Sequence, residues 1–145
     1  MNTIKVSLKN QIIGDQNPFI TIANRFTQDV VNKFQCKNGD QEIVAQCNLS
    51  PADCIKIQLT DRVHVNDSDK QTTIEIKNIF VDDINLQHII LNGIFYPDYD
   101  HNFFYKYKPY LHYKPGTKMY TNGVFELEIV QPISKFLVNS YEKRS

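Results

Sequence analysis

Several features that would identify a class of protein directly are missing from this 145-residue sequence. Lys plus Arg equals Asp plus Glu, at 16 each, so there is no basic excess of the kind that neutralises phosphates in nucleic-acid-binding proteins. No stretch approaches the roughly 18 apolar residues of a membrane-spanning helix, and the N-terminus lacks the apolar core of a signal peptide. We therefore expect no nucleic acid and no membrane as partners. Zero net charge nevertheless permits self-association into a homo-oligomer.

Cysteine is also scarce. Cys36, Cys47 and Cys54 cannot all pair with one another, and no C-x-x-C motif occurs. Neither a disulfide framework nor a zinc ribbon is therefore implied. We expect partly buried, unpaired thiols in a protein that is made in a reducing cytosol.

Motifs of catalysis are missing as well. The sequence has no G-x-S-x-G, no H-E-x-x-H and no P-loop. The four histidines show no helical metal spacing, and a role in hydrogen bonding between aromatic rings is their plainer interpretation; they are His64, His88, His101 and His112. The sequence therefore predicts a protein that is not an enzyme.

What the sequence does have is a succession of short segments with alternating apolar and polar residues. They lie at 4–8, 19–22, 42–47, 54–59, 72–81 and 123–130, and turn residues separate them. This pattern predicts an all-β fold: a single antiparallel β-sandwich, jelly-roll-like, over residues 1–145. Residues 29–34 suit a strand or a short helix, and a one-turn helix could start at Pro51. Apolar residues at helical spacing after Pro132 predict a short C-terminal helix.

The segment 95–113 is unusually aromatic. It holds nine of the 17 aromatic residues, and the prolines in and beside it predict a long loop. Tyrosine combines an apolar face with a polar tip, which suits sugar rings and protein surfaces alike. The rings could complete the core, form a glycan platform or form a protein interface. The candidate ligand-binding residues are Tyr96, Tyr99, Tyr105, Tyr107, Tyr110 and Tyr113.

A second candidate site is an acidic loop that begins at residue 61. Its oxygen-bearing side chains are Asp61, Asn66, Asp67 and Asp69. Calcium takes about six to eight oxygen ligands, often from one loop, so these residues are candidate calcium ligands. Asp, Asn and Ser also favour plain solvated turns, which is the alternative. Asp82 and Asp83 could add a ligand or form a tight connection between strands.

Motifs in the later two thirds of the chain are similar to those of a known group of proteins. They are the strand 54–61, the acidic loop through Asp69, the strand 73–84 with its pattern I-x-I-x-x-I-x-V-D, the residues 96–99 and the late strand 122–127. Together they resemble small β-sandwich virion proteins of tailed phages, which look like calcium-dependent xylan-binding modules. Asp83 stands where that pattern usually has glycine. The resemblance implies a jelly-roll-like sandwich and a place in the virion after synthesis in the host cytoplasm. For the xylan-binding relatives it also implies a calcium ion that contacts sugar hydroxyls.

Three functions follow from these observations. The leading one is a phage virion protein, on the tail, fibre or capsid, that binds glycan through the aromatic loop, with calcium as a candidate cofactor. The second is a structural subunit that uses the same loop as an interface with a neighbouring virion subunit. The third is a small hydrolase or lyase with an unidentified site.

Overall fold

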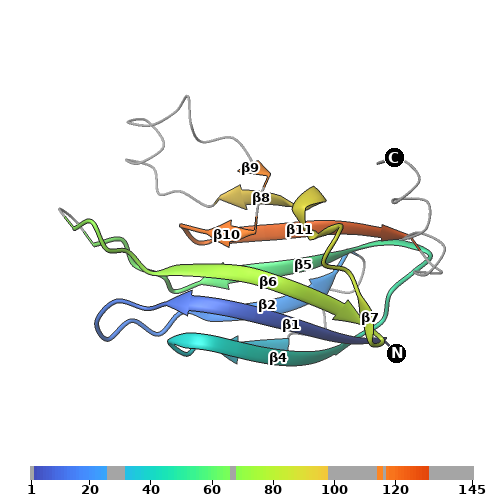
Figure 1. Cartoon of the computed structure of the whole chain (residues 1–145), viewed down its shortest axis with the longest axis horizontal. Coiled ribbons are helices and arrows are strands. Elements are labelled where there is room, and N and C mark those ends of the chain that lie inside the picture. The colour runs from blue at the N-terminus through green and yellow to red at the C-terminus, as the bar shows by residue number, and fades with distance from the viewer. Residues whose placement is uncertain (1, 26–31, 66–67, 98–113, 116, 131–145) are drawn as a thin grey trace.

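The structure, a computed structural model, describes residues 2–25, 32–65, 68–97, 114, 115 and 117–130 (Figure 1). The strands are β1 (Asn2–Gln11), β2 (Phe19–Asn24), β3 (Asn32–Gln35), β4 (Gly39–Cys47), β5 (Ala52–Thr60), β6 (Thr73–Val81), β7 (Ile84–Asn85), β8 (Ile94–Pro97), β9 (Lys114–Pro115), β10 (Lys118–Met119) and β11 (Gly123–Val130). Within these residues the only helical segment is the 3₁₀ turn η1 (Ile90–Asn92). The all-β prediction is confirmed, and the predicted C-terminal helix lies outside the described residues.

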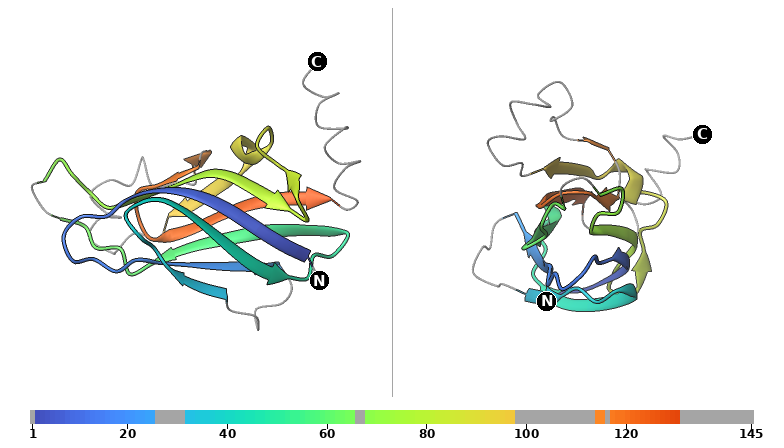
Figure 2. Two further views of the ribbon diagram at one scale, coloured as in Figure 1. Left: turned by 60° about the horizontal axis from the view of Figure 1, so that its bottom comes forward. Right: turned by 90° about the vertical axis from the view of Figure 1, so that its left-hand side faces the viewer.

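The strands form two sheets that face each other across the core (Figure 2). We call sheet A the sheet with the order β10-β6-β1-β4, in which β7 also pairs with β6. Sheet B has the order β3-β2-β5-β11-β8-β9. Every pairing between strands is antiparallel, which confirms the predicted β-sandwich. In the part of the chain that the structure describes, no helix combines the length and hydropathy that crossing a bilayer would require.

The core follows from alternation along the strands. Side chains in a strand point to opposite faces in turn, so residues of β1, β5 and β11 that face the other sheet lie two positions apart. In β6 the alternation is interrupted between Ile76 and Ile79, where the register with β1 shifts. The fully buried side chains include Ile4, Leu8, Ile20, Ile22, Ile55, Ile57, Leu59, Ile74, Ile76, Ile79 and Phe125. Each such side chain contributes about 1.5–3 kcal/mol by leaving water. This aliphatic layer makes the sandwich a rigid support for its connecting loops.

Three local expectations can now be compared with the structure. Of the segment 29–34, which suited a strand or a short helix, residues 32–34 lie in strand β3, whereas 29–31 lie outside the described residues. No one-turn helix forms at Pro51, because β5 begins at Ala52 and the Ser50 N–H is bound by the Asp53 carboxylate at 2.9 Å. Asp82 and Asp83, with φ of 48° and 66°, make the tight connection between β6 and β7. Asp82 also accepts hydrogen bonds from Thr3 N–H (2.8 Å) and Asn2 Nδ2 (2.6 Å).

Several connections lie together at one end of the sandwich, on the left in Figure 1. They are the β1–β2 connection (residues 12–18), the β5–β6 connection (61–72) and the β10–β11 connection (120–122), and we call them the loop end. The register brings them together, because Phe19 pairs with Thr60 and Gly123 pairs with both Leu59 and Pro97. Three segments that are far apart in the sequence therefore meet on one surface.

Candidate functional site

The β5–β6 connection is held in place by three side-chain amides. Each amide accepts a hydrogen bond from the backbone N–H of one loop residue and donates one to the carbonyl oxygen of the same residue. The pairs are Asn122 with Arg62 (2.9 and 3.0 Å), Gln16 with Val63 (3.0 and 2.9 Å) and Gln71 with Val65 (2.8 and 2.6 Å). The side-chain amides thereby bind the backbone N–H and C=O groups that a neighbouring strand would bind in a sheet.

These pairs tie the three connections of the loop end to one another. Gln16 belongs to the β1–β2 connection, and Asn122 comes directly before β11. Each hydrogen bond contributes about 0.5–1.5 kcal/mol net, so together they favour one conformation of the backbone at residues 62–65. A surface that is already ordered loses little conformational entropy when it binds a ligand. The loop end therefore has the rigidity that a binding site needs.

Arg62 is the cation at the centre of this arrangement. Its Nε donates to the carbonyl oxygen of Thr72 at 2.9 Å, and Thr72 is fully buried. The Arg62 side chain is itself half-buried, and burial lowers the pKa of the guanidinium below its ordinary value. Among the described residues the ion pairs are Arg25–Glu128, Lys56–Glu126 and Lys77–Glu75, so none of them neutralises Arg62.

Exposed apolar side chains gather on and beside the same end. In the described part of the chain four large apolar residues are exposed, and three of them lie here: Val63 (59%), Tyr120 (51%) and Tyr96 (42%). The Nζ of Lys118 lies 5.4 Å from the centre of the Tyr120 ring. Single exposed apolar residues are ordinary, but a group of them on a rigid surface marks a place for contact.

The predicted tyrosine site can be checked only at its beginning. Tyr99, Tyr105, Tyr107, Tyr110 and Tyr113 lie outside the described residues. Tyr96 is exposed, but it lies on strand β8 rather than in a loop, and its neighbour Phe95 is buried in the core at 4% exposure. The prediction of a continuous loop from residue 95 is therefore wrong for residues 95–97. Pro97 is compatible with β8 because it occupies the last position of the strand.

The predicted calcium ligands are placed in part. Asp61 and Asp69 are both exposed, whereas Asn66 and Asp67 lie outside the described residues. Asp61 has a left-handed backbone (φ 62°), and its carboxylate accepts a hydrogen bond from Thr60 Oγ1 at 3.3 Å. Among the described residues no three His, Cys, Asp or Glu side chains gather as a metal site. Two placed carboxylates supply only part of the oxygen set that calcium takes, so calcium binding stays a prediction.

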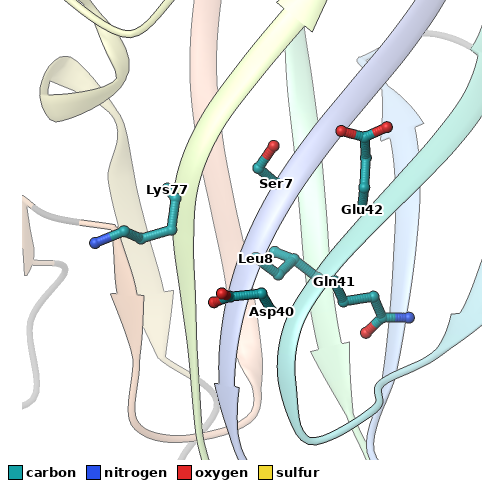
Figure 3. A pocket seen from close by; sticks show the side chains of 6 residues that line it. All are labelled: Ser7, Leu8, Asp40, Gln41, Glu42 and Lys77. Atoms are coloured by element: carbon teal, nitrogen blue, oxygen red, sulfur yellow. The ribbon is translucent and has the colours of Figure 1, made fainter.

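A separate hollow of about 400 Å³ lies on the outer face of sheet A (Figure 3). It is lined by Ser7, Leu8, Asp40, Gln41, Glu42 and Lys77. Asp40 and Glu42 are both exposed, and Lys77 pairs with Glu75 at 3.5 Å. We interpret the hollow as a solvated surface.

The thiols do not form a nucleophilic site either. Cys36, Cys47 and Cys54 are all unpaired, as expected, but they are fully buried rather than partly buried. Burial raises the pKa of Cys36 to about 12 and also raises the pKa of Cys47 and Cys54. A thiol acts as a nucleophile only as the thiolate, so these three are inert at neutral pH.

The loop end contains residues that sequence reasoning missed. Gln16, Arg62, Tyr120 and Asn122 were not among the candidates. Gln16 and Val63 are 47 positions apart, and Arg62 and Asn122 are 60 positions apart. No local sequence pattern predicts contacts between residues so far apart in the chain. The turn sequence Asn122-Gly123 before a strand was the one signal that could have indicated a structural role for Asn122.

Comparison with known proteins supports the fold. No family model and no curated protein matches the chain. Among solved structures, vCBM60 in complex with galactobiose is similar over 88% of this chain and 99% of its own, with a TM-score of 0.56 and 12% identity. A selenomethionine form of vCBM60 is similar over 87% and 89%, with a TM-score of 0.53 and 14% identity. For that protein, circular permutation provides an evolutionary link between two families of calcium-dependent carbohydrate-binding modules. The chain thus has a β-sandwich fold like that of the carbohydrate-binding module vCBM60.

Proposed function

We propose that this protein binds a glycan at its loop end and catalyses no reaction. The observation that carries the proposal is the β5–β6 connection, whose backbone is held at residues 62, 63 and 65 by side chains from three parts of the chain. A fold like that of vCBM60, which is found with galactobiose, supports this choice of ligand class.

The exposed rings supply the chemistry for a sugar. Pyranose rings have apolar C–H faces and polar edges, and an exposed tyrosine offers a flat apolar surface with a hydroxyl at its tip. Tyr96 and Tyr120 provide such surfaces. In this proposal the tyrosines at 99, 105, 107, 110 and 113 extend the contact area. Val63 is 59% exposed although its backbone is held by Gln16, so its side chain is available to the ligand.

Calcium is part of the proposal. Asp61, Asn66, Asp67 and Asp69 would hold the ion, and backbone carbonyls would complete its oxygen shell. We further propose that the protein belongs to the particle of a tailed phage, where a glycan-binding surface would contact the host cell. The similarity of sequence motifs to virion proteins supports this location.

The proposal is tested by glycan-array binding of the full chain, once with calcium and once with EDTA. We expect binding to at least one glycan class, and weaker binding after chelation. Tyr96→Ala should reduce affinity about two- to tenfold, since an aromatic contact contributes about 0.5–1.5 kcal/mol beyond buried area. Val44→Ala is the control, because Val44 is also exposed (49%, against 42% for Tyr96) but lies on sheet A. No glycan signal in either buffer would contradict the proposal.

The exposed apolar group also favours a second candidate, an interface between subunits. Val63, Tyr96 and Tyr120 would then pack against a neighbouring chain, and zero net charge opposes this association only weakly. Analytical ultracentrifugation at several concentrations decides between the two. A strict monomer that binds glycan supports the first candidate, whereas concentration-dependent assembly without glycan binding supports the second.

A further inference from the structure

The position of Arg62 points to the kind of glycan that the loop end binds. The Arg62 backbone N–H donates to Asn122 Oδ1 at 2.9 Å, and the Arg62 carbonyl oxygen accepts from Asn122 Nδ2 at 3.0 Å. Its side-chain Nε donates to the Thr72 carbonyl oxygen at 2.9 Å. The guanidinium is therefore held at its base, and little rotamer freedom remains to be lost when its outer nitrogens bind something.

The outer nitrogens of Arg62 are hydrogen-bond donors that remain available to a ligand. A guanidinium carries five N–H groups, and the contact with Thr72 uses one of them. In the described residues no carboxylate forms an ion pair with Arg62. Among the described residues the guanidinium of Arg62 makes this one hydrogen bond, to Thr72, and Arg62 is only half-buried, so its outer nitrogens reach solvent. A half-buried cation that forms no ion pair within the described residues favours an anion that arrives with the ligand.

The residues next to Arg62 indicate which class of anion would bind there. Val63, which follows Arg62, is 59% exposed, and Tyr120 lies two residues before the Asn122 that binds Arg62. Lys118 adds a second cation above the Tyr120 ring. A ligand that matches this surface has an apolar ring face and a planar anionic group on the same unit. A uronic acid has both, since its C–H face can pack on a side chain while its carboxylate takes two parallel N–H bonds.

We propose that Arg62 selects glycans that contain uronic acid residues, by binding the sugar carboxylate through its outer nitrogens. This inference rests on the proposed glycan-binding function and names its ligand class. Sulfated sugars share the anionic oxygens but not the planar geometry, so they are the informative comparison. Binding should weaken as salt is raised, because part of the attraction is between exposed charges.

The test uses the full chain and matched pairs of oligosaccharides. Oligogalacturonate, oligoglucuronate and mixed mannuronate–guluronate oligomers are each compared with their methyl esters, beside sulfated galacto-oligosaccharides, by isothermal titration calorimetry. We expect at least one acidic member to bind about tenfold or more tightly than its ester, which is the effect of one charged hydrogen-bonded pair. This comparison needs no variant, so it does not depend on how a substitution folds.

Variants then assign the effect to Arg62. Arg62→Gln should remove the difference between acid and ester, and Arg62→Lys should restore it only in part, because an ammonium lacks the planar fork. Arg25→Gln is the control, since Arg25 pairs with Glu128 through a guanidinium outside the loop end and should leave the difference intact. Thermal unfolding checks that each variant is folded.

The outcomes separate this inference from the function on which it rests. Equal or tighter binding of every ester, or binding of the sulfated oligomers alone, would overturn the role of Arg62 while leaving glycan binding in place. A difference between acid and ester that survives Arg62→Gln would overturn it too. Absence of binding to every oligosaccharide on the panel and on the array would refute the proposed function itself.

Discussion

Removing the buried carboxylate of Asp53 should destabilise the sandwich strongly. Asp53 is 1% exposed and accepts hydrogen bonds from the backbone N–H groups of Arg25 (2.8 Å), Ser50 (2.9 Å) and Cys54 (2.8 Å). It thereby joins the segment after β2 to the segment before β5, at the end of the sandwich opposite the loop end. Asp53→Ala removes the carboxylate and leaves these three backbone N–H groups without their acceptor.

The magnitude follows from these three contacts. A hydrogen bond to a charged group contributes about 1.5–3 kcal/mol, but the Arg25 and Ser50 donors are only partly buried and can regain water. We therefore expect Asp53→Ala to lower the free energy of unfolding by about 3–5 kcal/mol, a large share of the 5–15 kcal/mol that is usual for a domain. Asp40→Ala, which alters an exposed carboxylate on β4, is the control and should change stability by less than about 0.5 kcal/mol.

The effect should depend on pH with a definite sign. Burial opposes ionisation of Asp53, but the hydrogen bonds from Ser50, Arg25 and Cys54 outweigh it and hold the pKa of the carboxyl below its ordinary value. The stabilisation is therefore complete above the unfolded value of about 3.9 and is lost as pH falls through the folded pKa. Urea denaturation followed by far-UV circular dichroism at several pH values measures it. A loss below 1 kcal/mol at pH 7, or a difference between wild type and variant that grows on acidification, would refute the reasoning.

Two further predictions concern packing. A β-carbon on Gly123 would overlap the carbonyl oxygen of Tyr96 and lie 2.8 Å from Phe95 Cζ. Gly123→Ala should therefore lower the free energy of unfolding by about 1–3 kcal/mol and open the β8–β11 pairing. Hydrogen exchange of the β8 amides measures this opening, and unchanged protection of β8 would contradict the prediction. Because all three cysteines are buried with raised pKa values, the native protein should react with a thiol reagent at pH 7 far more slowly than the urea-unfolded protein, and one rapid equivalent in the native state would contradict the burial.

The sandwich itself could be predicted because its information is local. In β5 and β11 every second residue is apolar, and a strand with that period has one face to bury. The tight turn at Asp82 and Asp83 was likewise open to prediction as one of two alternatives, since Asp tolerates the left-handed backbone. The pattern did not predict the burial of Cys54, which is 1% exposed although it does not belong to the core cluster that contains its neighbour Ile55.

The candidate site could be predicted only in its location on loops. Tyr96 was named for its ring, and its place on a strand was missed because the prolines outweighed the strand propensity of Ile94, Phe95 and Tyr96. Arg62 carried no signal of its own, because its importance arises from the backbone contacts of Asn122 and the carbonyl of Thr72. Contacts of this kind depend on the register of distant strands, which composition and periodicity do not contain.

Mapping the ligand on the chain by NMR tests the central claim most directly. A ¹⁵N-labelled sample would be titrated with the best oligosaccharide from the array while backbone amide shifts are followed. We predict that the largest changes occur at residues 61–65 and 120–122 and at Tyr96, with none at the Asp82–Asp83 turn at the other end of the sandwich. Shift changes confined to that other end, or to the outer face of sheet A, would contradict the assignment of the loop end as the binding surface.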